Sequence, residues 1–559
     1  MIENSQCPNL STLIVNVSSH HMPDRIMFFE MHFEEHKTQL TFAFWFFITI
    51  IAKIGFHRFE SIKHVLPDSA LLLVLGSTFG GILFVMFPKH EIYLKPDWFF
   101  HFFLPPIALE AGYFMPNTEF FKNIGTIITY AVIGTLWNTV AIGLTLYAFN
   151  NYFDCDLSLI SIFLFATLIS AVDPVAVICV FEKIHVNQTL YICVFGESLL
   201  NDAVTIVLIH TMNVIASAGS DLQWNDYFIG LLSFFCVSIG GILVGGLWAV
   251  LTGIVTKLSQ DVDVRVVQPI TCVLFPYLAY LIAEALGLSG ILAIVVCGMG
   301  MKQYIMGNIP EQSLLTISYF MKTLSSSCEA VIFVFLGLSA VTAVVNHHRD
   351  FDFAFILITL AACFVYRFIG VGVLTYLVNK RRTERIGFVD QFIMGYGGIR
   401  GAVCYGLVMS LDPKTVTCRD LLSNTTIIVI LFTVFVQGGS IGKLATYLNV
   451  RLAKEYKGTL FEKLNDRAFR HSMGAFECIV GRRGNYWLKV KVDRINDKYV
   501  KPVIMAKYNQ TGMSIINFNQ ELETNEAVEY VKKHGTIAGM QMPLSDRDSY
   551  YVKSQTQSV

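Results

Sequence analysis

The stretch YFIGLLSFFCVSIGGILVGGLWAVLTGIV, residues 227–255, decides the fold class of this chain, because it contains no charged residue. A helix rises about 1.5 Å per residue, so roughly 20 apolar residues cross the hydrocarbon core of a bilayer, which is about 30 Å thick. An apolar block of this length therefore predicts a membrane-spanning helix.

The composition of the whole chain agrees with this interpretation. Hydrophobic residues make up 54% of 559 residues and charged residues only 15%, whereas soluble domains carry roughly 25% charge. The formal net charge of −1 gives no reason to expect a nucleic-acid partner. The twelve cysteines show neither a CxxC pair nor metal-ligand spacing. We expect an all-α polytopic membrane protein without a cofactor.

Thirteen apolar segments are candidate membrane spans, of which the first and the ninth are short. They cover residues 41–57, 69–87, 98–115, 123–149, 157–182, 189–216, 226–257, 264–285, 287–302, 313–345, 352–378, 387–411 and 420–448.

Basic residues predict the orientation, because cytoplasmic loops are enriched in Lys and Arg. With the N-terminus outside, the outer loops at 150–156 and 217–225 contain no Lys or Arg. The inner loops then hold the basic residues Arg58, Lys63, Lys183, Lys257, Arg265, Lys380, Arg381, Arg382 and Arg385.

The same orientation divides the chain into three parts. We expect an extracellular segment over 1–40, a membrane domain over 41–448 and a charged cytoplasmic tail over 449–559. The first part shows no signal-peptide pattern. Cys155 and Cys418 both fall in loops assigned to the outside, which would allow a disulfide between them.

Five ionisable residues lie inside predicted spans, where a charge costs several kcal/mol and usually indicates function. They are Asp173, Glu197, Asp202, Glu329 and Arg400. Ion pairs that only fix helix packing are the alternative, but one arginine cannot neutralise four carboxylates. Surplus acid in a membrane core is suited to holding a cation or a proton.

Two of these residues lie beside helix breakers. Asp173 precedes Pro174, and Arg400 lies in the glycine-rich run 395–401. Paired interruptions in two halves of a chain predict a transporter site built from inverted repeats. Asp173 could offset the positive N-terminal ends of broken helices, and Arg400 the negative C-terminal ends. The alternative is that the breakers only kink the helices.

A third segment, FGESLLND at 195–202, places several oxygen ligands together. Ser198 and Asp202 share a helix face, and Asn201 lies close to it. Oxygen ligands suit a hard cation, and burial disfavours the charged form of a carboxylate. Asp202 can therefore hold either a proton or a metal ion, and that competition yields coupled exchange.

At these residues the chain resembles the animal sodium/proton exchangers of the cation/proton antiporter superfamily, in its monovalent cation:proton antiporter 1 group. The motifs are SAVDPVAVICVFEKIHVNQTLYICVFGESLLNDAVTIVL (170–208), FFLPPIALEAGYFMP (102–116), SSSCEAVIFVFLG (325–337) and GYGGIRGAVCYGL (395–407). KIGFH at 53–57 resembles the plasma-membrane branch, and the similarity covers about residues 40–535, including 484–504.

The resemblance implies a homodimer in which an ion-binding core moves against a dimerisation domain. It implies that Asp202 carries the transported Na⁺ or proton, with Asn201, Asp173, Ser198 and Ser170 nearby. Glu197 would brace the site, and Arg400 would pair with either Glu197 or Glu329. Phe103, Leu104 and Gly112 match a region linked to amiloride-type inhibitors, in which Ala108 departs from the family pattern.

The resemblance also implies partners and a location. The segment at about 458–480 resembles the site for a calcineurin-B-like EF-hand subunit, while a helix on the membrane surface is the alternative. Membrane lipids are further expected partners. The expected location is the plasma membrane, with an endosomal membrane as the alternative.

The predicted function is sodium/proton antiport that regulates intracellular pH and sodium or volume. Asn201 cannot ionise, so Asp202 alone predicts electroneutral one-for-one exchange by alternating access. A cation channel, a receptor that has lost transport and an intramembrane enzyme are the rivals. We expect no enzyme, because HFEEH (32–36) and GGSIG (438–442) match hydrolase patterns in the wrong context.

Overall fold

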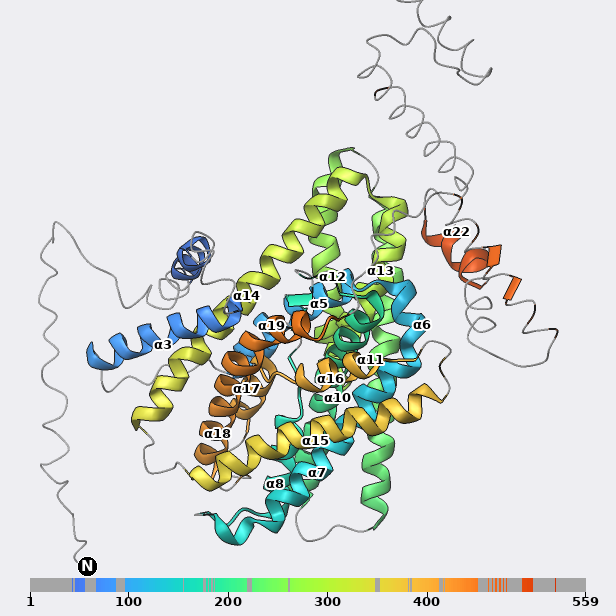
Figure 1. The fold of residues 1–559 in the computed structure, drawn as a ribbon. Coiled ribbons are helices and arrows are strands. Elements are labelled where there is room, and N and C mark those ends of the chain that lie inside the picture. Colours follow the sequence, from blue (N-terminus) through green and yellow to red (C-terminus); the bar gives the residue numbers. More distant parts are fainter. Residues whose placement is uncertain are drawn as a thin grey trace, which may run out of the picture.

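The computed structural model describes residues 46–55, 67–86, 96–153, 155–173, 186–218, 224–259, 262–346, 352–380, 385–411, 418–450 and 495–505, together with isolated positions such as Val177, Arg382 and Phe461. These ranges form helices and no β-strand (Figure 1). The all-helical class predicted from the apolar blocks is confirmed.

The first half of the described chain contains eleven helical elements. They are α3 (Asp68–Met86), α4 (Pro96–Trp98), η2 (Phe99–Phe103), α5 (Leu104–Phe114), α6 (Asn117–Ile128), η3 (Thr129–Gly134), α7 (Thr135–Ala148), η4 (Asn150–Tyr152), α8 (Leu159–Ile169), α10 (Gln188–Ala218) and α11 (Trp224–Leu258).

The second half continues with η6 (Val262–Val267), α12 (Gln268–Ala285), α13 (Gly290–Asn308), α14 (Glu311–Asn346), α15 (Phe353–Asn379), α16 (Phe388–Tyr396), α17 (Ala402–Met409), α18 (Arg419–Phe432), η7 (Thr433–Gly438), α19 (Gly439–Tyr447), η8 (Asn496–Val500) and α22 (Lys501–Ile504).

Helical segments lie within all thirteen predicted spans. Eight of the described helices are long and apolar enough to cross a membrane without interruption. The number thirteen is not established by this criterion, because the other segments are short or broken. The ninth span is longer than predicted: α13 begins after Ser289, whose Oγ accepts a hydrogen bond from Leu292 N at 3.4 Å, and it runs to Asn308.

Glycines allow two pairs of helices to pack closely. On α11, Gly241 and Gly245 lie against the backbone of α13, and on α3, Gly76 lies against the backbone of α14. Figure 1 shows α3 crossing α14, and the two helices contact each other along their length. Small residues stabilise helix pairs in this way in membranes, where lipid removes the hydrophobic drive for association.

Two packing groups can be distinguished among the described helices, and α14, which packs on α3, contacts members of both. In one group α11, α12 and α13 pack together and α13 also contacts α5, while in the other α7 packs on α8 and α15, and α10 packs on α6 and α8. The two interrupted helices belong to the second group, since α17 contacts α8 and α16 contacts α10 and α15.

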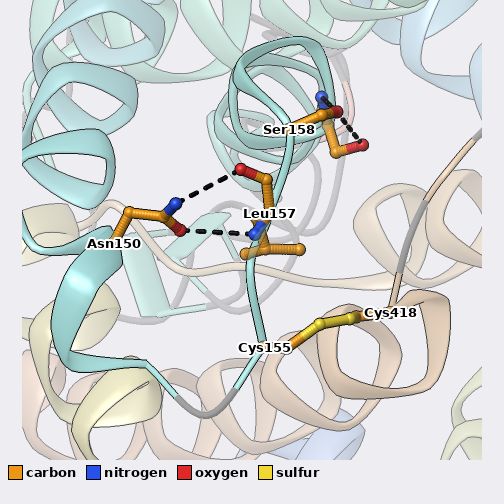
Figure 2. The surroundings of a disulfide bond; sticks show 6 residues. Asn150, Cys155, Leu157, Ser158 and Cys418 are labelled. Carbon is orange, nitrogen blue, oxygen red and sulfur yellow. Dashed lines mark hydrogen bonds between the residues drawn. A yellow bond between two sulfur atoms is a disulfide. The ribbon is translucent and has the colours of Figure 1, made fainter.

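A disulfide joins Cys155 to Cys418 across a sequence separation of 263 residues (Figure 2). It ties the loop before α8 to the start of α18. The same loop is held by Asn150, whose amide Nδ2 donates to Leu157 O and whose Oδ1 accepts from Leu157 N, both at 3.4 Å. The disulfide that the loop assignment allowed is confirmed.

A short segment of the predicted tail packs back on the membrane domain. Asn308 Nδ2 donates to Ile504 O at 3.0 Å and to Gly253 O at 2.9 Å. Lys257 Nζ donates to Val503 O at 2.7 Å. The segment 495–505 is thereby attached to the ends of α11 and α13. Most of the predicted partner helix at 458–480 lies outside the described residues.

Candidate ion-binding site

Two broken helices meet inside the second packing group. α8 ends at Ile169 and the chain continues without helical structure through Asp173, while α16 and α17 are separated by residues 397–401. The two interruptions pair directly, because Asp173 N donates to Ile399 O at 2.8 Å. The predicted pair of interrupted spans is confirmed. Pro174 lies outside the described residues.

Arg400 compensates the end of the other broken helix. Its Nη1 donates to Ser170 O at 2.9 Å and to Ala171 O at 3.0 Å, the carbonyls at which α8 ends. Only 1% of Arg400 is exposed. A guanidinium at a helix C-terminus offsets the partial negative charge of carbonyls that lack intrahelical partners. The position predicted for this arginine is therefore observed.

Asp173 makes the reciprocal contact. Its Oδ2 accepts a hydrogen bond from Ala402 N at 3.4 Å, at the N-terminus of α17. Gly401 allows this approach, because a Cβ at that position would collide with the Asp173 carboxylate. Each broken helix thus supplies the charged residue that stabilises an end of the other. These reciprocal contacts stabilise the crossing electrostatically.

The expected pairing of Arg400 with Glu197 or Glu329 is wrong. Within the described residues, Glu197 forms an ion pair with Arg367, whose Nη1 lies 2.5 Å from Glu197 Oε1. Both side chains are buried, and Arg367 Nη2 also donates to Met394 O at 3.3 Å. The physical reason is that Arg400 uses its donors on the carbonyls of α8, so a second arginine neutralises Glu197.

Arg367 is the main residue that the sequence analysis missed. It lies on α15, inside the predicted span 352–378, and is therefore a further ionisable group in the membrane core. The rule that selected Arg400 would have selected it as well. Two arginines therefore accompany the four carboxylates, instead of one. The excess of negative over positive groups in the membrane core is smaller than the sequence alone suggested.

Glu329 lies between the crossing and a second group of charged residues. Its charged neighbours are Lys53, Glu110, Asp68 and Asp173. Lys53 Nζ donates to Ser326 O at 2.7 Å, one helical turn before Glu329 on α14. Glu329 therefore faces a lysine on the first apolar helix rather than the arginine at the crossing.

The α10 residues line the crossing from a third side. Asn201 Nδ2 donates to Ser170 O at 3.3 Å, and Asn201 Oδ1 accepts from Thr205 Oγ1 at 3.1 Å. Ser198 is buried one turn earlier. Asn201 thus attaches α10 to the broken helix α8, and both polar atoms of its side chain are used within the protein.

Asp202 is the remaining carboxylate among the four that the sequence singled out. Its Oδ1 is buried and accepts no hydrogen bond from any described residue. Asp173 is its charged neighbour, close enough for the two carboxylates to interact. Together they provide two neighbouring carboxyl groups near the crossing, where Ser170 O is already bound by Arg400 and Asn201. This arrangement can hold one small cation or a proton, since burial makes an uncompensated carboxylate unfavourable.

The segment expected to contact inhibitors lies on η2 and α5. Phe103 and Leu104 are buried in the hydrophobic core. Gly112 lies against the backbone of Val295 and permits close packing of α5 on α13. Ala108 is buried on the same helix. Their association with inhibitors stays a prediction.

Comparison with known proteins identifies the family. The model of the transmembrane sodium/hydrogen exchanger family matches residues 46–447. The sodium/hydrogen exchanger 3 of Triakis scyllium is 44% identical over 513 residues, and that of Homo sapiens 43% identical over 512 residues; each alignment covers 90% of this chain and 61% of the relative. The sodium/hydrogen exchanger 2 of Rattus norvegicus is 39% identical.

The chain therefore spans about 61% of the length of the exchangers that it matches. A solved structure shows the fold: the sodium proton antiporter MjNhaP1 from Methanocaldococcus jannaschii superposes with a TM-score of 0.56 at 21% identity, over 74% of this chain and 99% of that one. The family model covers more than half of the sequence, including both broken helices and the Asp202 segment. The chain belongs to the transmembrane sodium/hydrogen exchanger family.

Proposed function

We propose that this protein exchanges one sodium ion for one proton across its membrane by alternating access. The observation that carries the proposal is the buried Asp202 carboxylate, whose Oδ1 accepts no hydrogen bond among the described residues. It lies beside the crossing of two broken helices, where transporters of this design bind substrate. The names of the similar proteins support sodium and protons as substrates.

The coupling follows from competition at Asp202. A proton and a sodium ion both neutralise its carboxylate, and a buried carboxylate is least stable when it holds neither. The other charges around the crossing already have partners: Arg400 binds the end of α8, Asp173 caps α17, and Glu197 is paired with Arg367. The ion-binding core therefore alternates between facing one side of the membrane and facing the other, with either a sodium ion or a proton bound to Asp202.

The exchange ratio depends on Asn201. Its side chain cannot ionise, and it is held by Ser170 and Thr205. One titratable carrier exchanges one proton for one sodium ion, so no net charge moves. In a cell with an inward sodium gradient, this cycle exports acid and regulates intracellular pH and sodium or volume.

The orientation is supported by the disulfide. Disulfides form in oxidising compartments and are rare in the cytosol, so the bond between Cys155 and Cys418 supports an outer location for both loops. We place residues 1–40 outside, the membrane domain over 41–448, and the tail 449–559 in the cytoplasm. The plasma membrane is the proposed location, with an endosomal membrane as the alternative.

The two packing groups suit a rocking mechanism. The group with both broken helices is the proposed ion-binding core, and the group around α11 and α13 is the proposed dimerisation domain of a homodimer. The segment at about 458–480 is proposed to bind a calcineurin-B-like EF-hand subunit, and lipids contact the apolar outer surface. Replacing Phe461 with Gln should release such a subunit in a pull-down from native cells.

The proposed function is tested with purified protein in liposomes that contain a pH-sensitive dye. Addition of each alkali cation should show proton movement for sodium, and a potassium–valinomycin potential should leave the rate unchanged. Asp202→Asn should abolish the signal in folded protein. A channel would give cation flux without proton counterflow, and a steep voltage dependence would show that Asp202 does not act alone.

A further inference from the structure

A small cavity with four polar side chains in a mainly apolar wall lies at the α16–α17 junction, and Asp202 is not among its lining residues. Its volume is about 20 Å³, and its walls come from α15, the α16–α17 junction, α18 and η7. Both buried arginines line it, together with Thr433 and Gln437. None of these four residues carries the transported ion in the proposed mechanism.

Three buried polar atoms of the cavity wall have no hydrogen-bond partner among the described residues. They are Arg367 Nε, Arg400 Nε and Gln437 Oε1. The exposed fractions of these residues are 5%, 1% and 6%, respectively. A buried donor or acceptor without a partner costs about 1–3 kcal/mol, and more if it is charged. Two charged donors and one acceptor around the same space therefore call for a bridging group.

The size of the cavity and the chemistry of its wall fit one water molecule. About 10–15 Å³ of such volume is enough for a water, which needs two to four polar partners. A water oxygen can accept from both Nε–H groups and donate one hydrogen to Gln437 Oε1. A chloride ion would satisfy the two arginines, but it is larger and cannot donate to an amide oxygen.

The local backbone explains why Gln437 reaches this position. η7 is a π-helical turn between α18 and α19, and such turns are often found at functional sites. It brings Thr433 and Gln437 to the same cavity. Thr433 Oγ1 also accepts a hydrogen bond from Arg400 N at 3.2 Å. The Thr433 side chain of the π turn thus holds the backbone of Arg400, and both Thr433 and Gln437 line the cavity.

We propose that this cavity is a binding site for a single water molecule, through which Gln437 positions the side chains of Arg400 and Arg367. The water joins the Glu197–Arg367 ion pair to the guanidinium that ends α8. Gln437 is a positioning residue, since it touches neither the ion nor Asp202. The water site stands on the geometry alone, whereas its effect on exchange rests on the proposed function.

Two variants of Gln437 separate positioning from packing. Gln437→Met keeps the length of the side chain but removes the acceptor, whereas Gln437→Glu keeps an acceptor oxygen. Gln268→Met is the matched control, because Gln268 is 1% exposed and its Oε1 also has no partner within the described residues. Gln268 lies at the start of α12, where its Nε2 donates to Ser259 O at 2.7 Å.

Gln437→Met should lower the maximal exchange rate about tenfold, the usual effect of losing a hydrogen bond to a charged group. The half-saturating sodium concentration should change less than about twofold, as the ion site is intact. Gln437→Glu should restore most of the rate. Gln268→Met should lower the thermal midpoint without lowering the rate comparably. Equal rate losses in both Met variants would overturn the positioning role.

The water site itself can be tested by thermal unfolding and by structure determination, without a transport assay. Arg400→Lys removes the Nε–H donor but keeps the charge, so the thermal shift caused by Gln437→Met should shrink in that background. A high-resolution structure should show density about 3 Å from the three atoms. If the thermal shifts of Gln437→Met and Arg400→Lys are additive in the double variant, the water bridge is rejected. It is also rejected if the thermal midpoint of the wild type is higher in chloride than in gluconate, because that would indicate a bound chloride ion. If the wild type shows no exchange, the proposed function fails while this test still decides the site.

Discussion

Arg367 offers the sharpest test of the electrostatic account of the site. The variant Arg367→Met removes the guanidinium but retains a long side chain in the core of α15. It leaves Glu197, of which 1% is exposed, without its ion-pair partner at 2.5 Å. The other oxygen of this carboxylate, Oε2, accepts no hydrogen bond from the described residues, so nothing nearby replaces the arginine.

The expected loss follows from the burial of the pair. Removing one partner of a buried ion pair costs about 3–5 kcal/mol, because the remaining charge is stranded in a low dielectric. For a large domain the midpoint shifts by about 2 °C or less per kcal/mol. The thermal midpoint of Arg367→Met should therefore fall by up to about 10 °C. Neutralising the stranded charge with Glu197→Gln in the double variant should recover much of this loss.

The assay is thermal unfolding of the purified protein at fixed pH, detergent and lipid. Arg419→Met is the control, because Arg419 is only half-buried and its Nη2 donates to a neutral partner, Met409 O, at 2.8 Å. Losing this hydrogen bond from a charged donor should cost about 1.5 kcal/mol, which is less than the loss expected for Arg367→Met. A double variant no more stable than Arg367→Met would refute the pairing. If Glu197→Gln instead recovered the thermal stability lost in Arg400→Met, Glu197 would be paired with Arg400, as the sequence alone suggested.

Three further outcomes are expected. Gly401→Ala should abolish exchange and destabilise the fold, because its Cβ would collide with the carboxylate that caps α17, whereas Gly372→Ala has open space and should be neutral in exchange and unfolding assays. Reduction should lower the thermal midpoint of the wild type, because the disulfide between Cys155 and Cys418 closes a long loop and such bonds stabilise by about 2–4 kcal/mol; a Cys418→Ser variant should be insensitive to reductant. Asn308→Leu should release the segment 495–505, since it removes the hydrogen bond from Asn308 Nδ2 to Ile504 O and also the one that ties Asn308 to Gly253 O on α11. Limited proteolysis should then cut the variant near this segment faster than the wild type, and equal cleavage rates would show that Asn308 is not the attachment.

The sequence by itself determined the all-helical class of the protein and the positions of its two helix interruptions. Apolar blocks such as 227–255 require helices, because backbone groups in lipid must be satisfied within the segment. Ionisable residues in those blocks marked the site, and the breakers beside Asp173 and Arg400 marked the interruptions. These inferences hold because they depend on the cost of a residue in the membrane, which is a local property.

Only the tertiary structure decided which charges meet. Arg400 and Glu197 lie in segments far apart in the sequence, and spacing cannot show that Arg400 binds the carbonyls of α8 while Arg367 takes the carboxylate. Asn201 was expected near the ion, yet its side chain also joins α10 to α8. The π turn that brings Gln437 to the arginines leaves no periodic signal. Long-range pairing depends on how helices cross, and that geometry is fixed by packing across the whole domain.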